Sequence, residues 1–268
     1  MKTRMISKVT LLVVLLWIFQ SCGTVPMTGR SQMAFLPESS MVEMSLTSYS
    51  QFLNENKVSA NRTQTDVVKR VGTRIAAAVE EYLKLNGFQD RIGDFKWEFN
   101  LVESEEVNAW CMPGGKVVFY TGILPLTQND AGVAVVMGHE IAHAVARHGN
   151  ERMSQQLLIQ MGGVALSEAV KQKPQETQTL FLAAYGAGSQ LGVILPYSRK
   201  HEYEADRMGM MFMAMAGYNP QEAPTFWARM SQLGSSNTPE FLSTHPVSEK
   251  RIEALNGLIP EAMTYYKK

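Results

Sequence analysis

Two histidines one helical turn apart are the strongest chemical signal in this sequence. His139 and His143 stand in the pattern His-Glu-x-x-His, and Glu140 directly follows the first histidine. Residues four apart on a helix share a face, so both imidazoles can reach one metal ion. Glu140 lies on the adjoining edge, where a carboxylate can take a proton from a metal-bound water. The pattern therefore predicts hydrolytic metal chemistry, with His139 and His143 as ligands and Glu140 as general base.

A catalytic zinc ion needs a third protein ligand, and two parts of the sequence could supply one. A third histidine on the same helix is the first option. It fails because Ala146 replaces the glycine of that longer pattern and His148 comes one residue too early. The second option is a carboxylate from another helix, and Glu202 offers it.

The segment around Glu202 contains two further carboxylates. Asp206 lies one turn after Glu202 on the same face, so it could accept an imidazole N–H and fix the tautomer of a histidine ligand. Glu204 points roughly 160° away from that pair and is the weaker candidate. We therefore predict that His139, His143 and Glu202 hold one zinc ion per chain. His148 is expected to be a helix-end cation or a structural hydrogen bonder.

Hydrophobic periodicity predicts the elements that must position these side chains. Residues 97–101 alternate as a strand does, and Pro113-Gly114-Gly115 indicates a hairpin between 107–112 and 116–121. The fold class is therefore α+β, mostly helical, with a small sheet or hairpin. Helices are expected at 37–56, 65–85, 130–148, 199–216, 220–233 and 247–255.

One long segment without charged residues, 177–198, raises the question of a membrane span. It contains two glutamines, three glycines and a proline, which weaken that interpretation. The alternative is a buried or lid-forming helix pair made with residues 153–169. We expect the helix pair.

The N-terminal segment has the features of a signal peptide. Basic residues precede an apolar run at Val9–Phe19 that is too short to span a bilayer. Small residues around Cys22 resemble a bacterial lipobox, so lipid attachment to Cys22 is expected; an ordinary signal peptide with an incidental cysteine is the alternative. The predicted organisation is a signal peptide at 1–21, an extended tether at 22–36 and a metallopeptidase domain at 37–268.

Composition excludes several classes of protein. The chain has 268 residues, 45% of them hydrophobic and 19% charged, which suits a packed domain rather than a disordered one. Lys+Arg 25 balances Asp+Glu 25, so no basic field is available for nucleic acid. The two cysteines exclude a disulfide scaffold. Cys111 could serve a cysteine protease, but a small buried hydrophobic residue is the simpler interpretation.

The chemistry-bearing segments together resemble a known family. Ser198-Arg199-x-x-Glu202-x-x-Ala205-Asp206, after the His-Glu-x-x-His pattern, is similar to the HtpX/CAAX-prenyl-endopeptidase family of zinc metallopeptidases, which are of the gluzincin type. Short lipid-anchored periplasmic members without a helical-repeat domain are the most similar. Further matching segments are Pro26-x-Thr28-Gly29-Arg30, Asn108-Ala109, Pro113-Gly114-Gly115, Tyr120-Thr121-Gly122, Thr244-His245-Pro246 and Arg251-Ile252.

The resemblance implies roles for further residues. The domain would have the zincin fold, with an edge strand of the sheet bordering the active-site cleft. Asn108 and Ala109 would bind substrate on that strand, Asp206 would support the ligands, and His245 would approach the metal. There His245 would either block the site at rest or stabilise the oxyanion.

The resemblance also implies a function. It is that of a zinc-dependent endopeptidase of the bacterial cell envelope that hydrolyses unfolded or misassembled envelope proteins. The expected location is the outer membrane, facing the periplasm, through a lipid anchor on Cys22. Outer-membrane assembly machinery is an expected partner, and nucleic acid is not. The alternative function is a non-enzymatic or latent chaperone for outer-membrane proteins.

Overall fold

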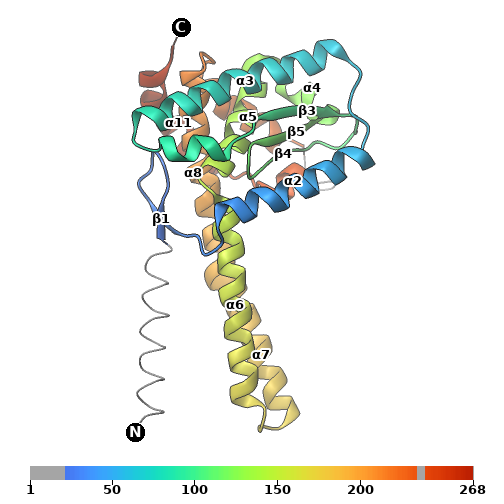
Figure 1. Cartoon of the computed structure of the whole chain (residues 1–268), viewed down its shortest axis with the longest axis vertical. Coiled ribbons are helices and arrows are strands. Elements are labelled where there is room, and N and C mark those ends of the chain that lie inside the picture. Colours follow the sequence, from blue (N-terminus) through green and yellow to red (C-terminus); the bar gives the residue numbers. More distant parts are fainter. Residues whose placement is uncertain (1–21, 234–238, 268) are drawn as a thin grey trace.

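The structure is a computed structural model that describes residues 22–233 and 239–267. The predicted signal peptide, 1–21, lies outside the described residues. A helical domain surrounds a small sheet, and two long helices project from the domain (Figure 1). This arrangement confirms the α+β, mostly helical class. The helices are α2 (Glu38–Glu55), α3 (Arg62–Leu85), α4 (Leu124–Thr127), α5 (Asp130–Val145), α6 (His148–Val170), α7 (Gln175–Ser189), α8 (Leu195–Met215), α9 (Glu222–Ser231), α10 (Glu240–Thr244) and α11 (Glu249–Tyr265).

The strands form two separate sheets. They are β1 (Cys22–Thr24), β2 (Ser31–Met33), β3 (Glu98–Val102), β4 (Ala109–Met112) and β5 (Lys116–Tyr120). In the larger sheet β5 is central, parallel to β3 and antiparallel to β4, with Ala109 opposite Phe119. The predicted hairpin is thus present. Among the described residues β4 is an edge strand of this sheet, with β5 on one side only.

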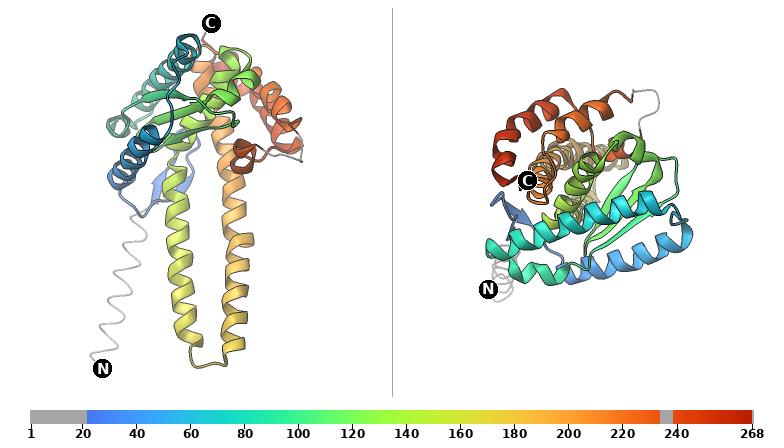
Figure 2. Two further views of the ribbon diagram at one scale, coloured as in Figure 1. Left: turned by 90° about the vertical axis from the view of Figure 1, so that its right-hand side faces the viewer. Right: turned by 90° about the horizontal axis from the view of Figure 1, so that it is seen from above.

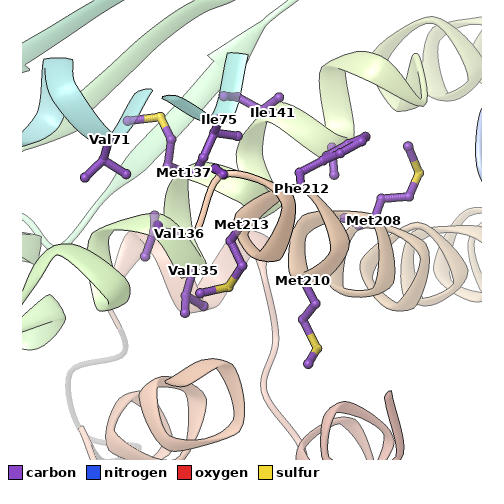
Figure 3. Close-up of a cluster of buried hydrophobic side chains, with 14 of the residues drawn as sticks. Val71, Ile75, Val135, Val136, Met137, Ile141, Met208, Met210, Phe212 and Met213 are labelled. Atoms are coloured by element: carbon purple, nitrogen blue, oxygen red, sulfur yellow. The ribbon is translucent and has the colours of Figure 1, made fainter. Parts of the chain in front are cut away.

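The core forms where α5 crosses α8, and α3 covers the crossing (Figure 3). Gly138 of α5 meets Gly209 of α8 with almost no room between the backbones. A Cβ built on Gly138 would lie 2.7 Å from the Gly209 carbonyl oxygen. The two glycines therefore let the helices touch, and this close contact sets the separation of the side chains on their facing sides. Apolar residues of the three helices surround the crossing: Val71, Ile75, Val135, Val136, Met137, Ile141, Met208, Met210, Phe212 and Met213.

The expected single helix over 130–148 is interrupted. Helix α5 ends at Val145, Arg147 adopts a left-handed conformation with φ 55°, and α6 begins at His148. Ion pairs hold Arg147 there, at 2.7 Å from Asp94 and 3.3 Å from Glu38. The break was invisible to periodicity because it depends on partners distant in sequence.

The segment 22–36, which was expected to be an extended tether, instead forms part of the folded domain. Strands β1 and β2 form an antiparallel ribbon, and Val25 between them is fully buried in the main core. The ribbon is fastened to α6, where the Phe35 N–H donates to the Ser154 hydroxyl at 2.9 Å. These residues are part of the folded domain because their side chains complete its core.

Helices α6 and α7 form the expected helix pair, but the pair is not buried. Both views of the molecule show the two helices side by side, extending away from the domain (Figures 1 and 2). No residue of α7 is buried. A π-helical turn, η3 (Gln190–Ile194), joins α7 to α8, so the projecting helix continues into the domain.

Candidate metal centre

Helices α5 and α8 bring the three predicted ligands together. The Nε2 atoms of His139 and His143 lie 3.1 Å apart, and each lies 3.4 Å from a carboxylate oxygen of Glu202. All three side chains are at least nine-tenths buried. One turn of α5 separates the histidines, and the close helix crossing places Glu202 opposite them.

His245 joins this set from the loop after α10. Its Nδ1 lies 3.0 Å from Glu202 and 3.1 Å from the Nε2 of His139. Its Nε2 lies 3.3 Å from Glu140. Ligand atoms from His139, His143, Glu202 and His245 all fall within 4.8 Å of one another. His245 therefore takes the position of a fourth donor.

The donor set suits zinc. Two imidazole nitrogens and one carboxylate are ligands that zinc accepts in hydrolytic sites, and the burial of the set excludes competing water. Burial favours the neutral acid at Glu202, but hydrogen bonds from the surrounding imidazoles hold its pKa well below the usual range. Glu202 is thus an anion already directed at the histidines.

Asp206 fixes the orientation of the first histidine. Its Oδ1 lies 3.0 Å from the Nδ1 of His139, which leaves Nε2 of that ring to face the ligand set. Burial alone would lower the pKa of His139, but hydrogen bonds to Asp206 and Glu202 raise it to about 9. Asp206 therefore lies where the sequence places it, as a partner of the ligand rather than a ligand.

Arg251, from α11, pairs with two of the three carboxylates of α8, Glu202 and Asp206. It donates to Asp206 at 2.5 and 2.8 Å, and its Nη1 lies 3.1 Å from Glu202. Its guanidinium group stacks on Trp227 at 3.9 Å from the ring centroid. Sequence reasoning gave Arg251 no role, because no spacing rule links it to His139, which is 112 residues away.

Glu140 has the surroundings of a poised base. Its carboxylate is buried, and burial raises its pKa above the usual value. Its Oε1 makes no hydrogen bond of good geometry among the described residues, although the Nε2 of His245 lies 3.3 Å from it, and the backbone N–H of Cys111 in β4 faces the carboxylate. A buried carboxylate with a raised pKa, next to the ligand set, can accept a proton from a water placed between them.

The edge strand lies against this site. Ala109 is buried, and Asn108 turns its side-chain oxygen back to accept the Ala109 N–H at 2.9 Å. The Phe241 N–H of α10 donates to the Val107 carbonyl at 3.2 Å, so the loop of His245 is fastened beside the strand. The Asn108 carbonyl oxygen accepts the Tyr120 N–H at 3.1 Å, so the Asn108 carbonyl and the Ala109 N–H are both paired within the domain.

Cys111 does not form a nucleophilic site. Burial raises the pKa of its thiol well above the usual value, so it stays protonated. Its Sγ lies 3.6 Å from the Met112 carbonyl oxygen, and no imidazole contact with it is described. Cys111 is a small residue packed against the main core, as the sequence suggests, but it is partly rather than fully buried.

A second buried polar network lies behind His143. The Nδ1 atoms of His143 and His148 are 2.8 Å apart, and the Nε2 of His148 lies 3.0 Å from Glu204. Arg30 of the N-terminal ribbon donates to Glu204 at 2.8 Å and to Glu151 at 2.7 Å. His148 is thus the structural hydrogen bonder that the sequence allows, and Glu204 faces this network instead of the ligand set.

Comparisons with known proteins show the family of this chain. Residues 69–259 match the model of Peptidase family M48. The mitochondrial metalloendopeptidase OMA1 of Arabidopsis thaliana is 32% identical over 238 residues, which is 88% of this chain and 44% of the relative. OMA1 of Schizosaccharomyces pombe is 38% identical over 184 residues, 64% of this chain and 49% of the relative.

A bacterial relative matches as well. The beta-barrel assembly-enhancing protease of Escherichia coli K12 is 32% identical over 165 residues, covering 58% of this chain and 33% of that protein. The chain spans about half the length, or less, of these relatives.

Proposed function

Because this chain belongs to the M48 family of zinc metallopeptidases, we propose that it is an endopeptidase whose zinc ion is held by His139, His143 and Glu202. The observation that carries the proposal is the convergence of two imidazoles and one carboxylate from α5 and α8. Glu140 stands beside them, and its Oε1 lies 3.3 Å from the Nε2 of His245. A structural zinc site would have no need of such a carboxylate.

Several side chains have distinct roles in peptide hydrolysis. A bound zinc ion supplies a Lewis acid that polarises the scissile carbonyl and lowers the pKa of water. Glu140 accepts the proton of the attacking water and returns it to the leaving amine. Asp206 and Arg251 keep His139 and Glu202 in place, so little reorganisation accompanies the reaction.

His245 gives the site a resting form. Its Nδ1 stands in the fourth donor position, where the attacking water would sit, so the loop after α10 must withdraw before hydrolysis. In the withdrawn position the same imidazole can stabilise the oxyanion. This placement also supports a second candidate function, a latent chaperone that holds clients while the protease is closed.

Substrate recognition is proposed to use the edge strand. Once the Asn108 side chain releases the Ala109 N–H, an extended chain can pair with β4 through main-chain hydrogen bonds, which favours unfolded segments of varied sequence. A cavity of about 260 Å³ beside Glu202, lined by Leu195, Tyr203 and Val247, offers room for a substrate side chain. Unfolded or misassembled proteins of the cell envelope are the proposed substrates, and outer-membrane assembly machinery is the proposed partner.

The catalytic proposal is tested by replacing the base alone. Glu140→Gln should keep one zinc ion per chain, measured by elemental analysis, and reduce casein cleavage at least about 100-fold. The matched control is Glu176→Gln on the exposed helix α7, which should keep full cleavage. Full cleavage by Glu140→Gln would refute the proposal. Restoration of an envelope defect by that inactive variant would favour the latent chaperone.

The membrane anchor is proposed at Cys22, with the outer membrane, facing the periplasm, as the location. A thiol-linked lipid would follow removal of residues 1–21. Cells labelled with radioactive palmitate should incorporate label into the protein, and Cys22→Ser should abolish the incorporation. Equal label in the Cys22→Ser variant would show that the lipid is absent from this residue.

A further inference from the structure

We propose that the hairpin of α6 and α7 inserts into a lipid bilayer, with the turn between the helices reaching the far headgroup region. The first observation is the apolar surface that the hairpin presents to solvent. Large apolar side chains are exposed along both helices and the following turn: Leu157, Leu158, Met161, Val164, Leu180, Phe181, Leu182, Leu191 and Leu195. Nothing in the described part of the chain covers them.

The distribution of these side chains indicates a bilayer rather than a protein partner. Leu180, Phe181 and Leu182 are consecutive, so they cover about 200° of the helix circumference. A partner helix covers one stripe, whereas lipid surrounds a helix and suits one that is apolar all round. The window within 175–215 has mean hydropathy 1.3 and is 0% buried.

The lengths fit the thickness of a membrane. Residues 177–198 carry no charge, and the part before the cavity at Glu202, 177–194, extends as a helix about 27 Å, against about 30 Å for the hydrocarbon layer. The uncharged run of α6 is shorter, because Ser154 and Gln155 are buried against the domain and the projecting part, 156–167, extends about 18 Å. Glu168, which follows it, is paired with Lys171. Lysines near a helix end can reach the headgroups with their long side chains, which extends the span.

Charged residues mark both ends of the hairpin. Lys171, Lys173 and Glu176 lie in and beside the turn, while Arg152, Arg199 and Lys200 are exposed at the root, near the domain. Basic residues at the root suit an anionic lipid surface. Charged residues therefore flank an uncharged middle segment, which is the order expected of a hairpin that spans a bilayer.

The two helices also pack as helices do in lipid. Gly162 of α6 lies so close to Tyr185 of α7 that a Cβ on it would meet the phenol oxygen. That hydroxyl donates to the Ile159 carbonyl at 2.9 Å. Small residues at helix contacts and polar groups paired between helices are the pattern of membrane interfaces.

The root of the hairpin lies beside the point where the chain enters the domain. The ribbon of β1 and β2, which starts at Cys22, contacts α6 through Arg30 and Glu151. Figures 1 and 2 show the ribbon at the end of the domain from which the hairpin projects. A membrane beside the ribbon and a membrane around the hairpin can therefore be the same membrane.

The test uses the full mature chain with Cys22→Ser, so that no lipid contributes. Flotation with vesicles of phosphatidylcholine and phosphatidylglycerol should recover the protein with the lipid. The variant Phe181→Glu/Leu191→Glu should reduce partitioning about 100-fold or more, because charges inside the bilayer are strongly disfavoured. The matched control Leu85→Glu/Met263→Glu changes two apolar residues that are exposed on the domain, and it should float as the parent does. Zinc content and casein cleavage, measured separately, should be unchanged in both.

A fluorophore reports the position of the hairpin directly. A Leu182→Cys variant in a background without Cys22 and Cys111, labelled with an environment-sensitive dye, should shift its emission to the blue with vesicles. The same dye at Leu85→Cys should not shift. Absence of flotation and of the shift would overturn the proposal. A stable dimer without lipid, dissociated by Phe181→Glu/Leu191→Glu, would also overturn it, since a second copy would then cover the hairpin.

Discussion

At the scale of single residues, each predicted histidine ligand is oriented from behind by a hydrogen bond. His139 is held by Asp206, and His143 is held by His148. If the metal binds Nε2 of His143, then its Nδ1 carries the proton and donates it to His148, whose own Nε2–H donates to Glu204. This series of hydrogen bonds requires His148 to be neutral. Burial is the main cause of this neutral state, because burial lowers the pKa of His148 to about 4.

The neutral state of His148 predicts a pH dependence of stability. The unfolded chain takes up a proton at His148 below pH 6.5, whereas the folded chain resists protonation until about pH 4. The unfolding free energy should therefore fall as the pH drops through this window, with about 2 kcal/mol lost at this residue between pH 7 and 5. Urea unfolding of the metal-free protein at several pH values measures the loss. In His148→Gln the unfolding free energy should fall less steeply as the pH drops. Equal slopes would contradict the role of His148.

At the scale of elements, the crossing of α5 and α8 is what positions the ligands. Gly209 lies seven residues after Glu202, and a Cβ on it would come within 2.8 Å of the Gly138 carbonyl carbon and the His139 nitrogen. Both contacts are backbone, so neither can move aside. A side chain here must separate the helices and draw Glu202 away from the histidines.

Gly209→Ala should therefore weaken both the fold and the metal site. We expect a loss of about 1–3 kcal/mol in unfolding free energy and at least about tenfold weaker zinc retention against a chelator. Gly257→Ala is the control, because its Cβ would enter open space on α11 and helix propensity favours alanine there. Unchanged zinc retention in Gly209→Ala would mean that α8 can adjust without moving Glu202.

The sequence predicted the elements wherever a local pattern produced them. Periodicity identified α3 and α5, and the glycines after Pro113 identified the β4–β5 hairpin. Sequence reasoning missed features that depend on distant partners. The left-handed Arg147 needs Asp94, and Arg251 reaches Asp206 from another helix. The exposure of α7 was also missed, because apolar composition alone does not distinguish a buried helix from one surrounded by lipid.

At the scale of the whole molecule, distant segments of the chain meet at the metal centre. The N-terminal ribbon supports Glu204 and Glu151 through Arg30, α5 and α8 supply the predicted ligands, and α11 supplies Arg251. The projecting hairpin and the site share α8, so Glu202 lies one turn past Ser198, the last residue of the uncharged segment. A membrane around the hairpin would hold the cleft close to its surface.

The position of Arg251 has a consequence for biosynthesis. Asp206 and Glu202 lie buried against a guanidinium group that is translated about fifty residues after them, and His245 also follows late. A nascent chain that has emerged only as far as α8 already contains every proposed ligand, but it lacks the cation that makes their burial tolerable. The proposed site therefore becomes complete only after α11 has been translated.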